Sequence, residues 1–152
     1  MFYNVKPTAW RGYLFDTTKP LFPFGWGLSY TGFEIGAPTL AKPSARIGEP
    51  LLVSVQVRNT GKRAGDEVVQ VYLHHTTAST AMPVKQLVAF ARVMNLAAGE
   101  ARTLEFKIEA AQLSLWNEAM QRVQEAGEIE LMSGSNSVEL KSTLVKIEEN
   151  KQ

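Results

Sequence analysis

Apolar and polar residues alternate along several stretches after residue 50, with the two-residue period of a strand that buries one face. In Leu51–Arg58 every odd position is apolar, and Asn59–Lys62 follows with the residues of a turn. Glu67–His75 is apolar on both faces, which is typical of a central strand, and Leu104–Ile108 alternates most clearly of all. These three stretches therefore predict strands.

Two further stretches fit that period poorly. Lys85–Leu96 is apolar at positions 87, 90, 93 and 96, which we interpret as a strand with a bulge, with a short helix as the alternative. Residues 109–124 contain four apolar side chains at helical spacing, Leu113, Trp116, Met120 and Val123. Taken alone, this second stretch predicts a helix.

The last thirty residues add two strands. Ile129–Leu131 and Val138–Ile147 are both rich in apolar residues, and Ser133–Asn136 between them has the composition of a hairpin turn. The polar tail Glu148–Gln152 is expected to fray. Strands of this length, separated by turn residues about every ten positions, predict an all-β fold, an antiparallel sandwich of about seven strands.

The beginning of the chain has a different character. Ten of the fourteen aromatic residues lie in residues 1–33, and five of them are in Leu21–Phe33 (LFPFGWGLSYTGF), a segment that we call the strap. Pro23 and three glycines interrupt the strap, so it can form neither a helix nor a central strand. Residues 2–19 show neither period and predict an extended linker.

Contiguous apolar surface on a soluble protein usually marks an interaction site. We therefore expect the aromatic residues of this segment to pack either on the domain's own sheet or on a neighbouring domain. The candidates for domain docking are Tyr3, Trp10, Tyr13, Phe22, Phe24, Trp26, Tyr30 and Phe33. An uncovered strap would also favour self-association of the chain.

Composition narrows the possible partners. The 152 residues are enough for one domain, and the net charge of +1 with no basic run argues against nucleic acid as the main partner.

No apolar run approaches the roughly 20 residues of a membrane span, and the first ten residues lack the apolar core of a signal peptide. The absence of cysteine excludes disulfides, thiolate metal sites and a cysteine nucleophile, but leaves the compartment open.

The sequence offers no constellation for catalysis. Asp66 and Glu67 are adjacent at the start of a strand, so their carboxylates should point to opposite faces rather than flank one sugar. His74 and His75 are the only histidines, and as strand neighbours they diverge, which argues against a metal site. There is no G-x-S-x-G motif, and Gly25–Gly27 lacks the context of a phosphate loop. We expect no catalytic residue, no cofactor site and no metal site.

Aromatic rings can also stack on sugars. Trp10, Trp26 and Trp116 are the candidates for such stacking, and interface or core packing is the alternative role of the same rings. A carbohydrate-binding module is therefore the alternative to a structural domain.

Five ordered blocks resemble one known family. They are PLFPFGWGLSYTGF at residues 20–33, NTGKRAGDEVVQVYL at 59–73, PVKQLVAF at 83–90, AGE at 98–100 and EAGEIEL at 125–131. Together they are similar to the C-terminal fibronectin type III-like domain of glycoside hydrolase family 3 enzymes, which include β-glucosidases and β-xylosidases. Residues 3–16 resemble the segment by which those enzymes leave their α/β sandwich domain.

The resemblance implies an immunoglobulin-like or fibronectin type III-like sandwich at residues 34–148, preceded by an extended aromatic linker at 1–33, which includes the strap, and followed by a frayed tail at 149–152. It replaces the predicted helix with strand, turn and strand over Leu113–Gln124, with the turn at Asn117–Met120. In the family the nucleophile and the acid/base lie in other domains, which this chain does not match. The resemblance therefore implies an accessory domain of a retaining β-glycosidase, and its partners would be the catalytic domains of that enzyme. It favours a periplasmic or secreted location, and a cytoplasmic one is compatible.

Overall fold

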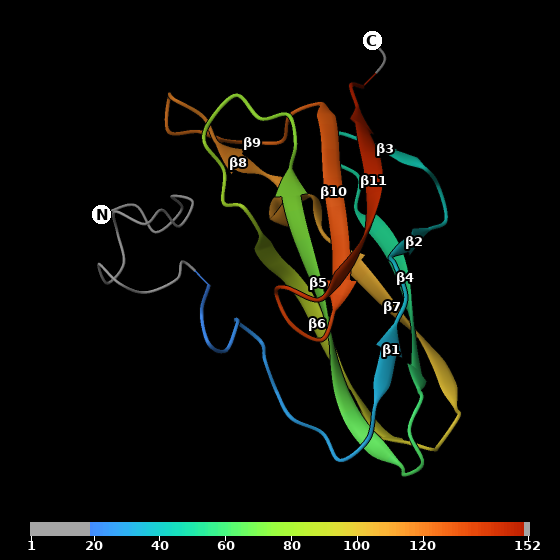
Figure 1. The fold of residues 1–152 in the computed structure, drawn as a ribbon. Helices are drawn as coiled ribbons and strands as arrows, with labels where there is room; N and C mark the ends of the chain where they lie inside the picture. The colour runs from blue at the N-terminus through green and yellow to red at the C-terminus, as the bar shows by residue number, and fades with distance from the viewer. Residues whose placement is uncertain (1–18, 151–152) are drawn as a thin grey trace, which may run out of the picture.

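The structure is a computed structural model that describes residues 19–150. Two β-sheets face each other across a hydrophobic core (Figure 1). The predicted linker up to residue 18, and with it Tyr3, Trp10 and Tyr13, lies outside the described residues. No helix within residues 19–150 is long and apolar enough to cross a membrane.

The first sheet is built on β4 (Leu51–Asn59). It pairs along one edge with β7 (Ala101–Ile108) and along the other with two short strands, β1 (Phe33–Ile35) and β2 (Thr39–Leu40). Odd-numbered side chains of β4 are buried and most even-numbered ones are exposed. The alternation predicted for this stretch is therefore confirmed.

The second sheet has five strands in the order β3 (Ser44–Arg46), β11 (Leu140–Glu148), β10 (Gly127–Gly134), β5 (Gly65–His75) and β6 (Gln86–Leu96). Its pairs are antiparallel except for β3 with β11, which is parallel. β5 lies between β10 and β6, so the prediction of a central strand is confirmed. The side chains of Val69, Val71 and Leu73 on β5 enter the core between the sheets.

The irregular period of β6 comes from a bulge. Val71 pairs with Ala89 and the next residue, Tyr72, pairs with Leu87, so Val88 is an extra residue on β6. A second irregularity lies near Leu96, where Asn95 has a positive φ of 49°. The bulged strand is confirmed and the helical alternative is wrong.

The helix predicted from spacing in residues 109–124 is wrong as well. A four-residue 3-10 turn, Ala110–Leu113, leads into a small hairpin of β8 (Leu115–Trp116) and β9 (Arg122–Val123). Trp116 and Met120 are exposed, so the helically spaced apolar residues do not form one buried face. Met120 adopts a φ of 59° in the hairpin turn, where no glycine is present. The strand, turn and strand implied by the family resemblance is what the structure has.

Two boundaries differ from the sequence prediction. Ser133 and Gly134 still belong to β10, so the turn before β11 begins two residues later than expected. Glu148 pairs with Arg46 as the last residue of β11, and the amide of Asn150 donates to the carbonyl of Ile47 at 3.3 Å. The antiparallel sandwich is otherwise as predicted, with short strands added at its edges.

Candidate docking surface

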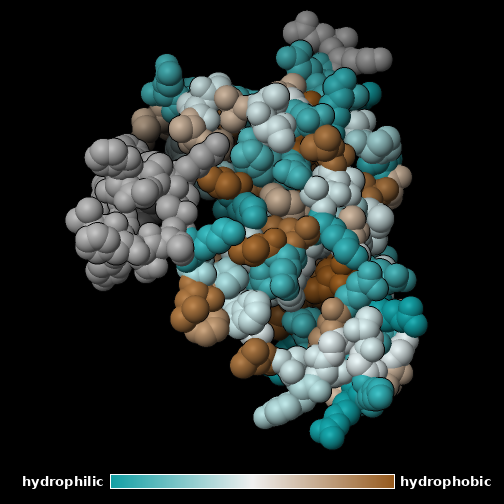
Figure 2. Space-filling view, viewed as in Figure 1, coloured by the Kyte–Doolittle hydropathy of each residue, from teal (hydrophilic) through white to brown (hydrophobic). Residues whose placement is uncertain are grey.

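The strap runs as an irregular chain alongside β5 and β6 before it enters the first sheet as β1 (Figure 1). Its large apolar side chains other than Phe33 are exposed, from 43% for Trp26 to 98% for Tyr30, and they include Leu21, Phe22, Phe24 and Leu28. The rings of Phe22 and Trp26 contact each other with centroids 6.3 Å apart. Figure 2 shows brown apolar side chains on the margin where the strap runs.

The backbone of the strap, in contrast, is fixed to the second sheet. Gln70 on β5 is only 5% exposed, and its amide nitrogen donates to the carbonyls of Gly25, at 3.2 Å, and Ser135. The Tyr72 hydroxyl donates to the Gln70 amide oxygen, which orients the amide. The backbone N–H of Ser137 donates to the carbonyl of Phe24 at 2.9 Å. This end of the strap is therefore held through its carbonyl groups.

Gly25 is required for that contact. Its φ is +79°, a left-handed conformation that other residues resist, and an added Cβ would lie 2.1 Å from the Gln70 side chain. Two constraints, one of backbone conformation and one of space, thus explain the glycine in this part of the strap.

A second anchor holds the other end of the strap. Asn59, the last residue of β4, is fully buried, and its amide oxygen accepts from the Thr31 hydroxyl at 2.9 Å and the Gly61 N–H at 3.0 Å. Its amide nitrogen donates to the carbonyls of Arg63 and Leu96. All hydrogen-bonding groups of this buried amide face a partner, as a buried polar side chain requires.

The strap is thus ordered by buried polar anchors while its rings stay in contact with solvent. Rings held in place before binding lose little entropy when a partner covers them, and buried aromatic anchors dominate many interfaces. The arrangement fits a pre-formed docking surface. Sequence reasoning missed both anchors, because Gln70 and Asn59 carried no signal beyond being polar residues in apolar strands.

The remaining predicted docking and stacking residues are placed differently. Phe33 begins β1 and packs against the domain's own core. Trp116 is 59% exposed on β8, which lies in the upper part of Figure 1, whereas the strap runs down the left side of the view and reaches β1 from below. Trp26 and Trp116 therefore do not form one stacking platform.

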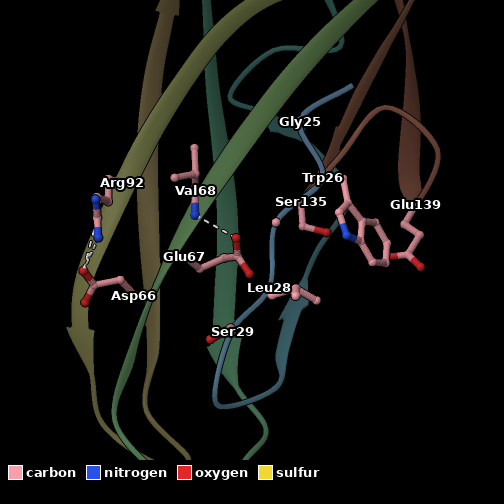
Figure 3. A pocket seen from close by; sticks show the side chains of 11 residues that line it. Gly25, Trp26, Leu28, Ser29, Asp66, Glu67, Val68, Arg92, Ser135 and Glu139 are labelled. Atoms are coloured by element: carbon pink, nitrogen blue, oxygen red, sulfur yellow. Dashed lines mark hydrogen bonds and ion pairs between the residues drawn. The ribbon is translucent and has the colours of Figure 1, made fainter. Parts of the chain in front are cut away.

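Asp66 and Glu67 point in different directions, as predicted (Figure 3). Asp66 pairs with Arg92 at 2.7 Å and accepts from the N–H of Asn95, and these hydrogen bonds lower the pKa of its carboxyl. Glu67 lies beside the strap, and burial raises its pKa, although an N–H bond from Val68 opposes the shift. Because Asp66 is already engaged, the two acids do not form a hydrolytic pair.

Both acids nevertheless line one cavity of about 400 Å³ between the strap and the second sheet. Trp26 and Leu28 of the strap, Arg92 of β6 and Glu139 of the turn before β11 also line it (Figure 3). Sequence reasoning missed this juxtaposition, since Glu139 is far from Glu67 along the chain.

The two histidines do not converge on a metal site. Within residues 19–150 no group of three His, Cys, Asp or Glu side chains is arranged to hold a metal ion. Burial lowers the pKa of His75, with a further lowering by His74 and an opposing effect of the Glu125 carboxylate.

The fold and the comparisons with known proteins agree on the class of domain. Residues 67–137 match the family model of the fibronectin type III-like domain. A periplasmic β-glucosidase of Salmonella typhimurium is 40% identical over 91% of this chain, and a β-xylosidase of Formosa agariphila is 42% identical over 82% of it. The crystal structure of a β-glucosidase from Listeria innocua in complex with glucose superposes on 90% of this chain with a TM-score of 0.82 and 37% identity.

Residues 67–137 therefore match a fibronectin type III-like domain, and the resemblance to that domain of family 3 glycoside hydrolases is confirmed. The chain spans only 18% of the Salmonella protein, 17% of the Formosa protein and 19% of the Listeria chain. The similarity thus concerns one domain of much longer relatives.

Proposed function

We propose that this chain is a non-catalytic accessory domain of a family 3 β-glycosidase and that the strap fastens it to the catalytic domains. The observation that supports this most strongly is the contrast within the strap between an anchored backbone and exposed rings. A domain that used these rings for its own core would bury them. The reaction of the parent enzyme would be hydrolysis of a β-glycosidic bond with retention, performed by residues outside this chain.

The contribution of the domain would be mechanical. Removing one large apolar side chain from water stabilises a contact by about 1.5–3 kcal/mol, so a strap with several covered rings could hold two domains together. Catalytic loops next to that interface would then be held in fewer conformations. The domain would stabilise the parent enzyme in this way without any of its residues contacting the substrate.

The test is the substitution Trp26→Ala in the full-length enzyme. We expect a lower melting temperature with little change in kcat on an aryl β-glycoside, because the ring would stabilise the interface and not the transition state. Trp116→Ala is the matched control, since Trp116 is also an exposed tryptophan but lies away from the strap. Unchanged melting together with a collapse of kcat would argue against a structural role.

A further inference from the structure

The cavity under the strap has an excess of negative charge. Among the described residues that line it, Asp66, Glu67 and Glu139 contribute three carboxylates, and Arg92 contributes the one cation. Arg92 is already paired with Asp66. Glu139 accepts from the Asn136 amide at 3.2 Å, and Glu67 accepts from the N–H of Val68, so both are hydrogen-bonded to neutral groups.

Among the described residues that line the cavity, Glu67 is the half-buried carboxylate for which no cationic partner is seen within residues 19–150. Its side chain is half-buried between β5 and the strap, and the structure gives its carboxylate one hydrogen bond, from the N–H of the next residue. A carboxylate withdrawn from water without a cation is unfavourable, and burial raises its pKa accordingly. A cation in the cavity would remove this penalty.

The strap supplies the other half of a cation site. Trp26 lines the same cavity as Glu67 and Glu139, and its indole stands next to Glu139 (Figure 3). An aromatic face attracts ammonium and guanidinium groups, and tryptophan does so best. A neutral sugar could stack on the indole but would leave the charge of Glu67 unbalanced, so the charge of the cavity favours a cation.

We propose that this cavity receives a basic side chain, lysine or arginine, from the catalytic domain on which the strap docks. This inference rests on the proposed function and adds the chemistry of the partner surface. The apolar rings would supply the area of the contact, and the basic side chain, paired with Glu67 and Glu139 beside Trp26, would fix its register. Complementary charges at an interface contribute specificity in this way.

The experiment compares Glu67→Gln in two molecules, this 152-residue chain alone and the full-length enzyme. Alone, the substitution should leave the melting temperature unchanged or raise it, because it removes a desolvated and unpaired charge. In the full-length enzyme it should lower the midpoint of the transition in which this domain unfolds by about 2–4 °C, and about 1 M NaCl should reduce that difference. Glu139→Gln should act in the same direction, and Glu105→Gln, on the exposed face of β7, is the control and should have no effect.

If Glu67→Gln changes the melting temperature of the isolated chain and of the full-length enzyme by the same small amount, the proposal is overturned. If Trp26→Ala still destabilised the full-length enzyme in that case, docking of the strap would stand and only the basic partner would be excluded. If Trp26→Ala were also silent, the docking itself would fail. The two results separate this inference from the proposed function.

Discussion

Asn59→Ala tests whether the strap depends on its buried polar anchor. The substitution deletes four hydrogen bonds of one fully buried side chain, those to Thr31, Gly61, Arg63 and Leu96. At about 1 kcal/mol for each bond, the free energy of unfolding should fall by about 3–4 kcal/mol, slightly less than the sum because the bonds share one amide. For a domain of this size that corresponds to a fall of roughly 6–16 °C in melting temperature.

The assay is thermal and urea unfolding of the 152-residue chain, followed by circular dichroism. Asn136→Ala is the matched control, because Asn136 is also a buried asparagine with four side-chain hydrogen bonds, but all of them, to Ser135, Val138 and Glu139, lie within its own turn. Its two amide N–H bonds are long, at 3.2 Å, and one of them goes to the exposed Glu139, so its replacement should cost less, about 1–2 kcal/mol. If Asn59→Ala costs less than its control, this amide does not join the strap and the two sheets as its four hydrogen bonds indicate, and the reasoning is refuted.

Three other predictions follow from the same contacts. Gly25→Ala should release the strap from Gln70 and increase the proteolysis of residues 19–32 without unfolding the sandwich; an unchanged cleavage rate would contradict the assigned contact. Because burial lowers the pKa of His75 below 6.5, the folded state binds fewer protons than the unfolded state at acidic pH, and the free energy of unfolding should fall as the pH drops below about 6.5. His75→Gln should therefore make the melting temperature depend less on pH between about pH 7.5 and about pH 5.5. An equal pH dependence in the wild-type chain and the variant would refute this. Calorimetry of the chain with cello- and xylo-oligosaccharides should give no binding heat, whereas binding that is lost in Trp116→Ala would favour a carbohydrate-binding module.

Local patterns were sufficient to predict the long strands, but not the short strands β1, β2 and β3. The alternation in Leu51–Arg58 and the apolar faces of Glu67–His75 reflect burial of side chains that are neighbours along the chain. The strap was also predictable as irregular backbone, since Pro23 and its glycines restrict what the segment can form. The helical spacing of apolar residues in 109–124 predicted a helix that the structure does not have. These residues are divided between the core and the surface, so they do not form one buried face.

The features that give the strap its shape depend on contacts far apart in sequence. Gln70 reaches Gly25 and Ser135, and Asn59 reaches Leu96 on the opposite sheet. Nothing local distinguishes these amides from ordinary polar residues of a strand. Likewise, Glu67 and Glu139 share a cavity only because β5 and the turn before β11 are brought together by the sheet.

The central claim is that a neighbouring domain covers the exposed rings of the strap. Hydroxyl-radical footprinting can measure this directly as the oxidation rate of Phe22, Trp26 and Tyr30 in the 152-residue chain and in the proposed full-length enzyme, with Trp116 as the internal reference. The account predicts that the three strap residues are oxidised several-fold more slowly in the full-length enzyme while Trp116 is unchanged. Equal oxidation of the strap in both molecules would contradict it.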